Sequence, residues 1–97
     1  MRRAEERARG KLARDLERLF QLGPGGSAER PIPITSPSEV EAQARSIPCP
    51  ICDGELKVEE HAAETVGTAR LRVARVICAI CHARRSIYFQ LASARLN

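Results

Sequence analysis

The chain contains no tryptophan, one methionine and only three aromatic residues among its 97 residues. Apolar residues make up 43% of the sequence, which is enough for one small core but not for a large one. A chain of this length and composition is therefore expected to form one small domain with appendages.

Long apolar runs are also missing. Residues 1 to 20 hold no apolar stretch long enough for a signal peptide or a membrane span. In the same region Glu5, Glu6, Asp15 and Glu17 interrupt the basic side chains, which argues against a mitochondrial presequence. We therefore expect a cytoplasmic protein that does not enter a membrane.

Signals of catalysis are absent as well. The sequence has no glycine-rich loop that could hold a phosphate group. It also has no combination of Ser, His and Asp that suggests nucleophilic catalysis. We therefore expect a protein that is not an enzyme.

Acidic residues are absent after Glu64. Seven acidic residues stand between Glu39 and Glu64, against only Arg45 and Lys57. Six arginines follow without any Asp or Glu: Arg70, Arg72, Arg75, Arg84, Arg85 and Arg95. The net charge of +4 thus combines an acidic stretch with a basic one that follows it.

Four cysteines form the most informative pattern in the chain. They stand in two Cys-x2-Cys pairs, Cys49-Pro-Ile-Cys52 and Cys78-Ala-Ile-Cys81, with 25 residues between the pairs. Each such pair can supply two of the four ligands of a tetrahedrally coordinated ion, and zinc is the usual metal in a site with four thiolates. The pattern predicts one structural Zn²⁺ ion bound by these four residues, with Gly54 leaving the first turn at positive φ.

Other interpretations of the cysteines fit less well. A disulfide framework needs an oxidising compartment, and a thioredoxin-like motif needs a single pair beside a βαβ pattern. Iron bound as in rubredoxin would use the same ligands, but three aromatic residues are few to enclose such a centre.

His82 follows Cys81 directly and could replace a cysteine as a metal ligand, yet four thiolates already fill the site. His61 is expected in a solvated loop.

The first 22 residues predict an amphipathic helix. Apolar side chains recur at steps of three and four, and Gly23 followed by Pro24 is typical of a helix end. A narrow apolar stripe on a helix has to be buried against another surface, which could belong to a second copy, to the rest of the chain or to another protein. A basic helix on nucleic acid or on a membrane surface is a further alternative. The residues expected to make the contact are Leu12, Leu16, Leu19 and Phe20.

Residues 23–36 have the Gly- and Pro-rich composition of a linker, although Ile32 and Ile34 could form an extended strand edge. The run from Ser36 to Glu39 is a capping box with Pro37 in the first helical position. It predicts a short helix from Pro37 to about Arg45. We assign this helix and the metal domain to one unit, residues 37–97, in which Val40, Ala44 and Ile47 face the metal domain.

Three segments alternate polar and apolar residues as half-buried strands do. They are residues 55–59, residues 70–73 with Leu71 and Val73 inward, and residues 86–91 with Ile87, Phe89 and Leu91 inward. A loop is expected at residues 62–68. At Ala74-Arg75, where the alternation breaks, we expect either a bulge or a strand buried on both faces. The expected fold is a small metal-stapled α+β protein with a three-stranded antiparallel sheet.

The cysteine pairs and the strand pattern together resemble the zinc-ribbon fold group over residues 47–91. The resemblance implies a structural zinc ion and a binding module rather than a reaction. Zinc ribbons of elongation factors that enter RNA polymerase carry an Asp-Glu pair at the hairpin tip. This chain has Glu59-Glu60 and Glu64 there, so that activity is not implied.

Function must then reside on the surfaces of the molecule. One hypothesis is a protein-interaction module that uses the first helix or the charged halves of the metal domain. The alternative is a nucleic-acid binder, although Tyr88 is the only aromatic residue expected to face outward. In that alternative the phosphate contacts come from Arg70, Arg72, Arg75, Arg84 and Arg85.

Overall fold

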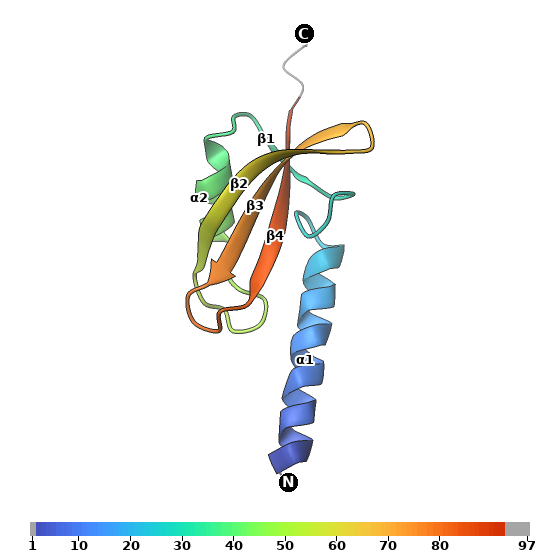
Figure 1. Ribbon diagram of the computed structural model, residues 1–97, viewed down its shortest axis with the longest axis vertical. Coiled ribbons are helices and arrows are strands. Elements are labelled where there is room, and N and C mark those ends of the chain that lie inside the picture. The colour runs from blue at the N-terminus through green and yellow to red at the C-terminus, as the bar shows by residue number, and fades with distance from the viewer. Residues whose placement is uncertain (1, 93–97) are drawn as a thin grey trace.

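The structure is a computed structural model that describes residues 2–92, so Arg95 lies outside the described residues. It is a small α+β protein with two helices and a four-stranded mixed sheet (Figure 1). The elements in chain order are α1 (Arg2–Leu22), β1 (Ile32–Ile34), α2 (Glu39–Ser46), β2 (Leu56–Val66), β3 (Ala69–Cys78) and β4 (Arg84–Leu91).

The sheet has the strand order β1-β4-β3-β2. Strands β2, β3 and β4 pair antiparallel, while β1 runs parallel to β4 with Ile32 opposite Phe89. The prediction of a three-stranded antiparallel sheet is therefore wrong, because β1 adds a fourth strand that runs parallel to its neighbour. Pro33 has no N–H to give to a ladder, which suits β1 to an edge position. The expected strand at Ile32 and Ile34 is thus present within the predicted linker.

The hairpin of β2 and β3 is longer than expected. β2 continues to Val66, so the loop predicted at residues 62–68 shrinks to a tight turn at Gly67, whose φ is 62°. The bulge lies on β2, where the register shifts between Val58 and Glu60, and not at Ala74-Arg75. In β3 the neighbouring residues Val73 and Ala74 are both buried, so the alternation breaks there because this strand is buried on both faces, as the other expectation had it.

The core lies on one face of the sheet. Pairing places Arg72 opposite Phe89 and Val76 opposite Arg85, so these residues share a face. Leu71 and Val73 of β3 are buried as predicted, although they do not belong to the main core cluster. The cluster comprises Ile34, Val40, Ala44, Cys49, Leu56, Ala74, Val76, Cys78, Ile87 and Phe89.

α2 covers this core with Val40 and Ala44, and Ile47 packs beside them as predicted. The helix begins at Glu39 rather than Pro37, and its N-cap Ser38 makes no capping bond through its side chain. The carboxylate of Glu39 instead accepts hydrogen bonds from the N–H and the hydroxyl of Thr35. The capping box thus predicts the helix but not its first residue.

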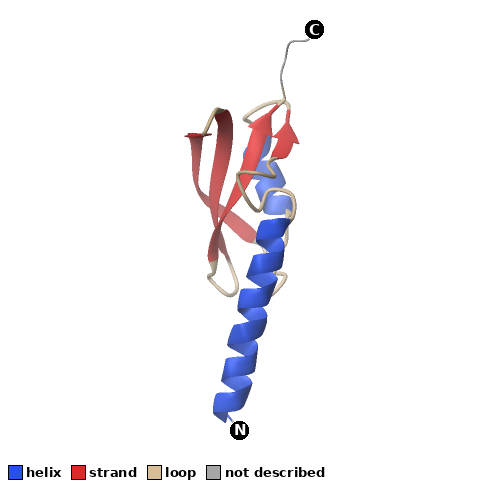
Figure 2. Ribbon diagram, turned by 90° about the vertical axis from the view of Figure 1, so that its right-hand side faces the viewer, coloured by secondary structure: helices blue, strands red, loops and turns tan. Residues whose placement is uncertain are grey.

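α1 runs beside the sheet and extends past its end, which makes the molecule 61 Å long (Figures 1 and 2). Only its C-terminal part meets the core, where Phe20 packs against the cluster. The turn that follows is fixed by Gly25, whose φ is 80° and whose carbonyl accepts a hydrogen bond from Tyr88 N–H at 2.8 Å. This contact ties the end of α1 to the edge of β4.

Candidate metal centre

The first cysteine pair forms a tight loop before β2. Cys49 N–H donates to the Gly54 carbonyl at 2.9 Å, and Asp53 N–H donates to the Cys49 carbonyl at 2.8 Å. Ile51 N–H points at the Cys49 sulfur at 3.4 Å. These bonds curl the backbone around Cys49 and bring Cys52 to the same side.

The second pair repeats this geometry between β3 and β4. Cys78 N–H donates to the Ala83 carbonyl at 2.9 Å, and His82 N–H donates to the Cys78 carbonyl at 3.0 Å. Ile80 N–H points at the Cys78 sulfur at 3.3 Å. The two loops therefore have the same backbone hydrogen bonds, although the second contains neither Pro nor Gly.

Glycine plays a different part in the first loop than expected. The residues at positive φ are Asp53 and His82, at 66° and 62°, each directly after the second cysteine of its pair. Gly54 is required for space, because a Cβ there would lie 2.7 Å from Ile80 Cγ1 and 2.9 Å from Cys78 Sγ. The prediction of positive φ at Gly54 is therefore wrong, and close approach of the second loop explains that glycine.

The two loops bring all four sulfurs together. The Sγ atoms of Cys49, Cys52, Cys78 and Cys81 lie within 4.8 Å of one another, with 3.7 Å from Cys49 to Cys81 and 3.4 Å from Cys52 to Cys78. Tetrahedral Zn–S bonds of 2.3 Å place two sulfurs about 3.8 Å apart, so one metal ion fits between them. A disulfide needs about 2.0 Å, and all four cysteines are free.

The surroundings of the sulfurs favour thiolates. The backbone N–H of Cys81, followed by that of Ile80, donates to Cys78 and lowers the pKa of its thiol to about 6 against the effect of burial. Burial would raise the pKa of Cys49, but N–H groups and Arg85 together lower it. The hydrogen bond from Cys52 to Cys78 raises the pKa of Cys52 to about 12. The lowered pKa values of Cys78 and Cys49 mean that these two thiols lose their protons more readily than an ordinary cysteine, as metal binding requires.

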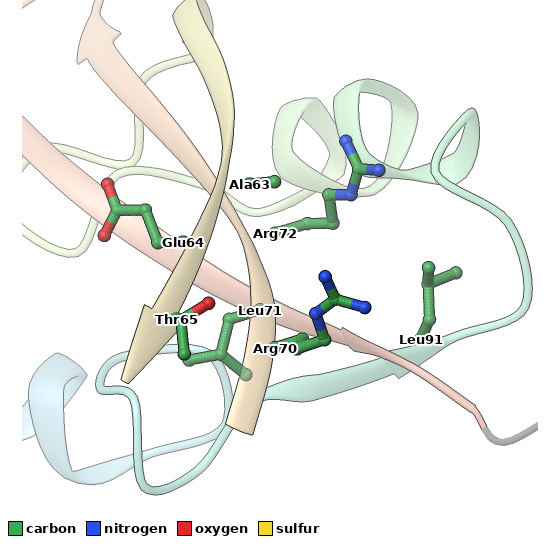
Figure 3. A pocket seen from close by; sticks show the side chains of 7 residues that line it. All are labelled: Ala63, Glu64, Thr65, Arg70, Leu71, Arg72 and Leu91. Carbon is green, nitrogen blue, oxygen red and sulfur yellow. The ribbon is translucent and has the colours of Figure 1, made fainter. Parts of the chain in front are cut away.

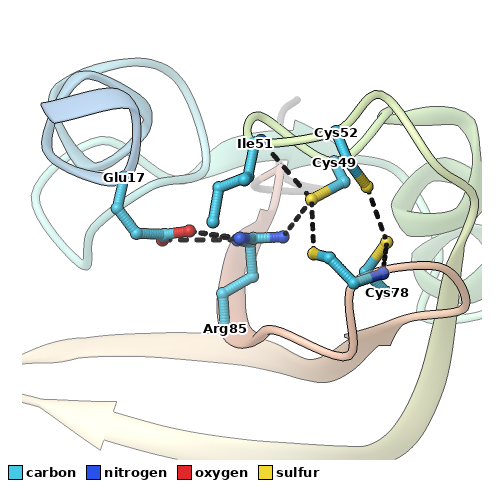
Figure 4. A network of polar contacts seen from close by, with 7 residues as sticks. Glu17, Cys49, Ile51, Cys52, Cys78 and Arg85 are labelled. Carbon is cyan, nitrogen blue, oxygen red and sulfur yellow. Dashed lines mark hydrogen bonds and ion pairs between the residues drawn. The ribbon is translucent and has the colours of Figure 1, made fainter. Parts of the chain in front are cut away.

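Arg85 joins the metal centre to α1 (Figure 4). Its side chain is only 3% exposed, and its Nη1 donates to the Cys49 sulfur at 3.5 Å. Its Nε donates to the Glu17 carboxylate at 3.1 Å, and its Nη2 pairs with the same carboxylate. The guanidinium also lies over the Phe20 ring, 5.6 Å from the ring centre.

Sequence reasoning placed Arg85 on the outer surface and missed this role. Ile87 and Phe89 are buried as predicted, and Arg85 precedes them at the same spacing of two. The alternation therefore assigns Arg85 to the core face, but its positive charge led us to place it on the surface. α1 also approaches the first loop at a second point, where Leu12 and Leu16 line a small open hollow together with Ile51.

The other arginines do not form one basic face. Arg75 pairs with Glu64 at 2.6 Å, and Arg84 pairs with Glu59 at 2.9 Å. The acidic stretch therefore folds back onto the basic one across the sheet, and the charges largely compensate each other. Arg70 and Arg72 lie apart from these pairs and line a cavity near the end of β4.

The two histidines have different environments. His82 is exposed beside the second loop, as expected. His61 lies within β2 rather than in a loop, and its buried Nε2 has no hydrogen-bond partner among residues 2–92. The expectation of a solvated loop histidine is therefore wrong, because β2 is longer than predicted.

Fold and site together define a small α+β protein with a cluster of four cysteines that could hold one metal ion. Neither the protein-family models, nor the curated proteins, nor the solved structures with which the chain was compared contain a match to it. Within residues 2–92, neither helix has the length and apolar character needed to cross a membrane.

Proposed function

We propose that this protein is a non-catalytic binding module of the zinc-ribbon type, folded around one Zn²⁺ ion and acting through contacts with other protein surfaces. The four thiolates would fill the coordination sphere of the ion. A closed site of this kind leaves no position for water or substrate, which supports a structural rather than a catalytic metal. The same ligands accept iron, so metal analysis is part of the test.

The surface of α1 supports the protein-interaction part of the proposal. Phe20 packs against the core cluster, but Leu12, Leu19 and Leu22 are 58%, 65% and 63% exposed. Three exposed leucines on one helix form a small apolar surface of the kind that protein contacts bury. These leucines are the single observation that carries the proposal, and the simplest partner is α1 of a second copy.

Light scattering on the full-length, zinc-loaded protein tests this association. We expect a mass above that of one chain at high concentration, falling to one chain in the double variant Leu12→Gln and Leu19→Gln. The matched control is Lys11→Gln, which changes an exposed charged residue of α1. An equal mass for the wild type and the double variant contradicts self-association through α1.

Nucleic-acid binding is the second candidate function, and Arg70 and Arg72 favour it. Three of the five predicted arginines are paired with acids, which leaves little charge for a phosphate backbone. A titration with mixed-sequence DNA and RNA at about 50 mM salt decides, because phosphate contacts are strongest at low salt. Absence of binding removes this candidate, whereas binding lost on Arg70→Ala and Arg72→Ala supports it.

A further inference from the structure

Strands β3 and β4 separate before either of them ends. Their pairing stops at Arg72 opposite Phe89, although β3 is paired with β2 as far as Ala69 and β4 is paired with β1 as far as Leu91. Residues 69–71 therefore have a strand partner only on the β2 side. We call the opening between the two strands the β3/β4 fork; it is lined by residues 63–65, residues 70–72 and Leu91.

The fork contains two cationic side chains without acidic partners. Arg70 and Arg72 project to the same side of β3, toward Leu91, and enclose a cavity of about 290 Å³ (Figure 3). Neither forms an ion pair with any of residues 2–92. Glu64 also lines the fork, but its carboxylate lies on the other side of the strand and pairs with Arg75 at 2.6 Å.

Two neighbouring guanidinium groups favour an anionic ligand. Arg72 is half-buried, so its charge is partly removed from water without a compensating carboxylate. Each guanidinium presents a fork of N–H donors that matches a carboxylate or a phosphate. Arg70 and Arg72 are two residues apart on one strand, so their side chains leave the backbone about 7 Å apart, which is the length of two residues of an extended chain.

The open strand edge distinguishes a peptide from a nucleic acid. An extended peptide can pair its backbone with residues 69–71, whereas a phosphodiester chain cannot use that edge. No aromatic side chain lines the fork, so stacking with a base has no support there. Leu91, which is 39% exposed, adds apolar surface that suits a side chain of a peptide.

We propose that the β3/β4 fork binds an extended acidic segment of a partner protein, with two of its carboxylates on Arg70 and Arg72. The segment adds to the free edge of β3. The inference rests on the proposed function, since it also requires a protein partner, but it uses a surface other than α1.

An NMR titration of the full-length, zinc-loaded protein tests this site. The probe is the end-blocked peptide Val-Glu-Val-Glu-Val-Glu, in which alternate carboxylates match the spacing of the two arginines. We expect amide shifts confined to residues 63–72 and 89–92, and slower hydrogen exchange at residues 69–71. Arg70→Gln and Arg72→Gln should each raise Kd about tenfold, because each removes a charge-assisted contact. The matched control is Arg84→Gln, which removes the same charge from the ion pair with Glu59.

Three results of the peptide titration overturn the inference, as does a fourth from competition with DNA. The three are equal weakening by Arg84→Gln, equal binding of the neutral peptide Val-Gln-Val-Gln-Val-Gln, and shifts outside the fork. Displacement of the peptide by single-stranded DNA of equal charge, at lower concentration, also overturns it in favour of a phosphate ligand. The Leu12→Gln and Leu19→Gln double variant should keep peptide binding while losing self-association, so failure at the fork is distinct from failure of the role of α1.

Discussion

Arg85 is the residue that connects the metal centre to the rest of the molecule. It stands on β4 and touches a sulfur of the first loop and a carboxylate of α1. A buried guanidinium is stable only while it is paired, so these two contacts depend on each other. We therefore expect the position of Glu17 and metal binding at the cysteine cluster to be coupled, with the coupling acting in both directions.

We predict that Glu17→Gln weakens metal binding although Glu17 is not a ligand. The change leaves the Arg85 charge buried without its carboxylate. Because Glu17 is 28% exposed, the expected loss of stability is about 2 kcal/mol, below the range for a fully buried pair. Chelator competition should show zinc affinity lower by about tenfold. Asp15→Asn is the control, since Asp15 pairs only with exposed Lys11; equal affinities of the two variants would refute the coupling.

Gly54 provides a second test at this scale. We predict that Gly54→Ala lowers stability by about 1 to 3 kcal/mol, because its Cβ would press on Ile80 and on the Cys78 sulfur. Gly10→Ala in α1 is the matched control, where the added methyl meets only Arg14 Nη1 at 3.4 Å. That change should be neutral or stabilising. Thermal unfolding of the zinc-loaded proteins measures both effects, and a neutral Gly54→Ala would mean that the two loops are not packed as described.

Single residues show where sequence reasoning succeeds and where it fails. The cysteine spacing predicted the cluster because two residues between ligands set a local geometry. The positions of Asp53 and His82 at positive φ, and the packing of Gly54 on Ile80, arise from two loops that are far apart in the sequence. Spacing within one loop carries no information about such a contact.

At the scale of elements, the alternation predicted most of the buried residues of β3 and β4 but not the length of the β2–β3 hairpin. β4 has Ile87 and Phe89 inward as predicted, whereas Leu91, also expected inward, is 39% exposed because it lies at the end of the strand. The β2–β3 hairpin is longer than predicted because the run from Ala62 to Val66 lacks apolar alternation, and its strand character depends on pairing with β3. β1 is short, and its partner β4 lies more than 50 residues away in the chain.

β1 should contribute to stability in spite of its length. Ile34 is 2% exposed and belongs to the core cluster, so Ile34→Ala should cost about 2 to 4 kcal/mol. Pro33→Ala is the control, because Pro33 is exposed between two packed residues. Chemical denaturation of the zinc-loaded variants measures the difference. Equal stability of the two variants would show that the segment is a linker only.

The start of α2 makes a small, pH-dependent contribution. Hydrogen bonds from the hydroxyl and then the N–H of Thr35 lower the pKa of Glu39 from its ordinary 4.5. A lowered pKa in the folded state means that the stabilisation is complete above 4.5 and is lost as the pH falls through the folded value. The stability difference between wild type and Glu39→Gln should therefore shrink as the pH falls from about 7 to about 4. A difference independent of pH would contradict this contact.

At the scale of the whole molecule, the four cysteines cross-link two loops at one end of a small sheet. The cluster joins the loop before β2 to the loop between β3 and β4, and through Arg85 it also joins α1. The core cluster has ten residues and only one large aromatic side chain, Phe89. Zinc binding to small domains is worth about 10 to 16 kcal/mol, which exceeds the net stability of most domains. The metal ion should therefore decide whether the sheet persists.

The most direct test is metal removal, followed by metal analysis and far-ultraviolet circular dichroism on one reduced sample. The account predicts one zinc ion per chain, loss of the β-sheet signal when a strong chelator removes it, and recovery of that signal when zinc is returned. A reduced protein that keeps the same spectrum without any metal would contradict the central claim.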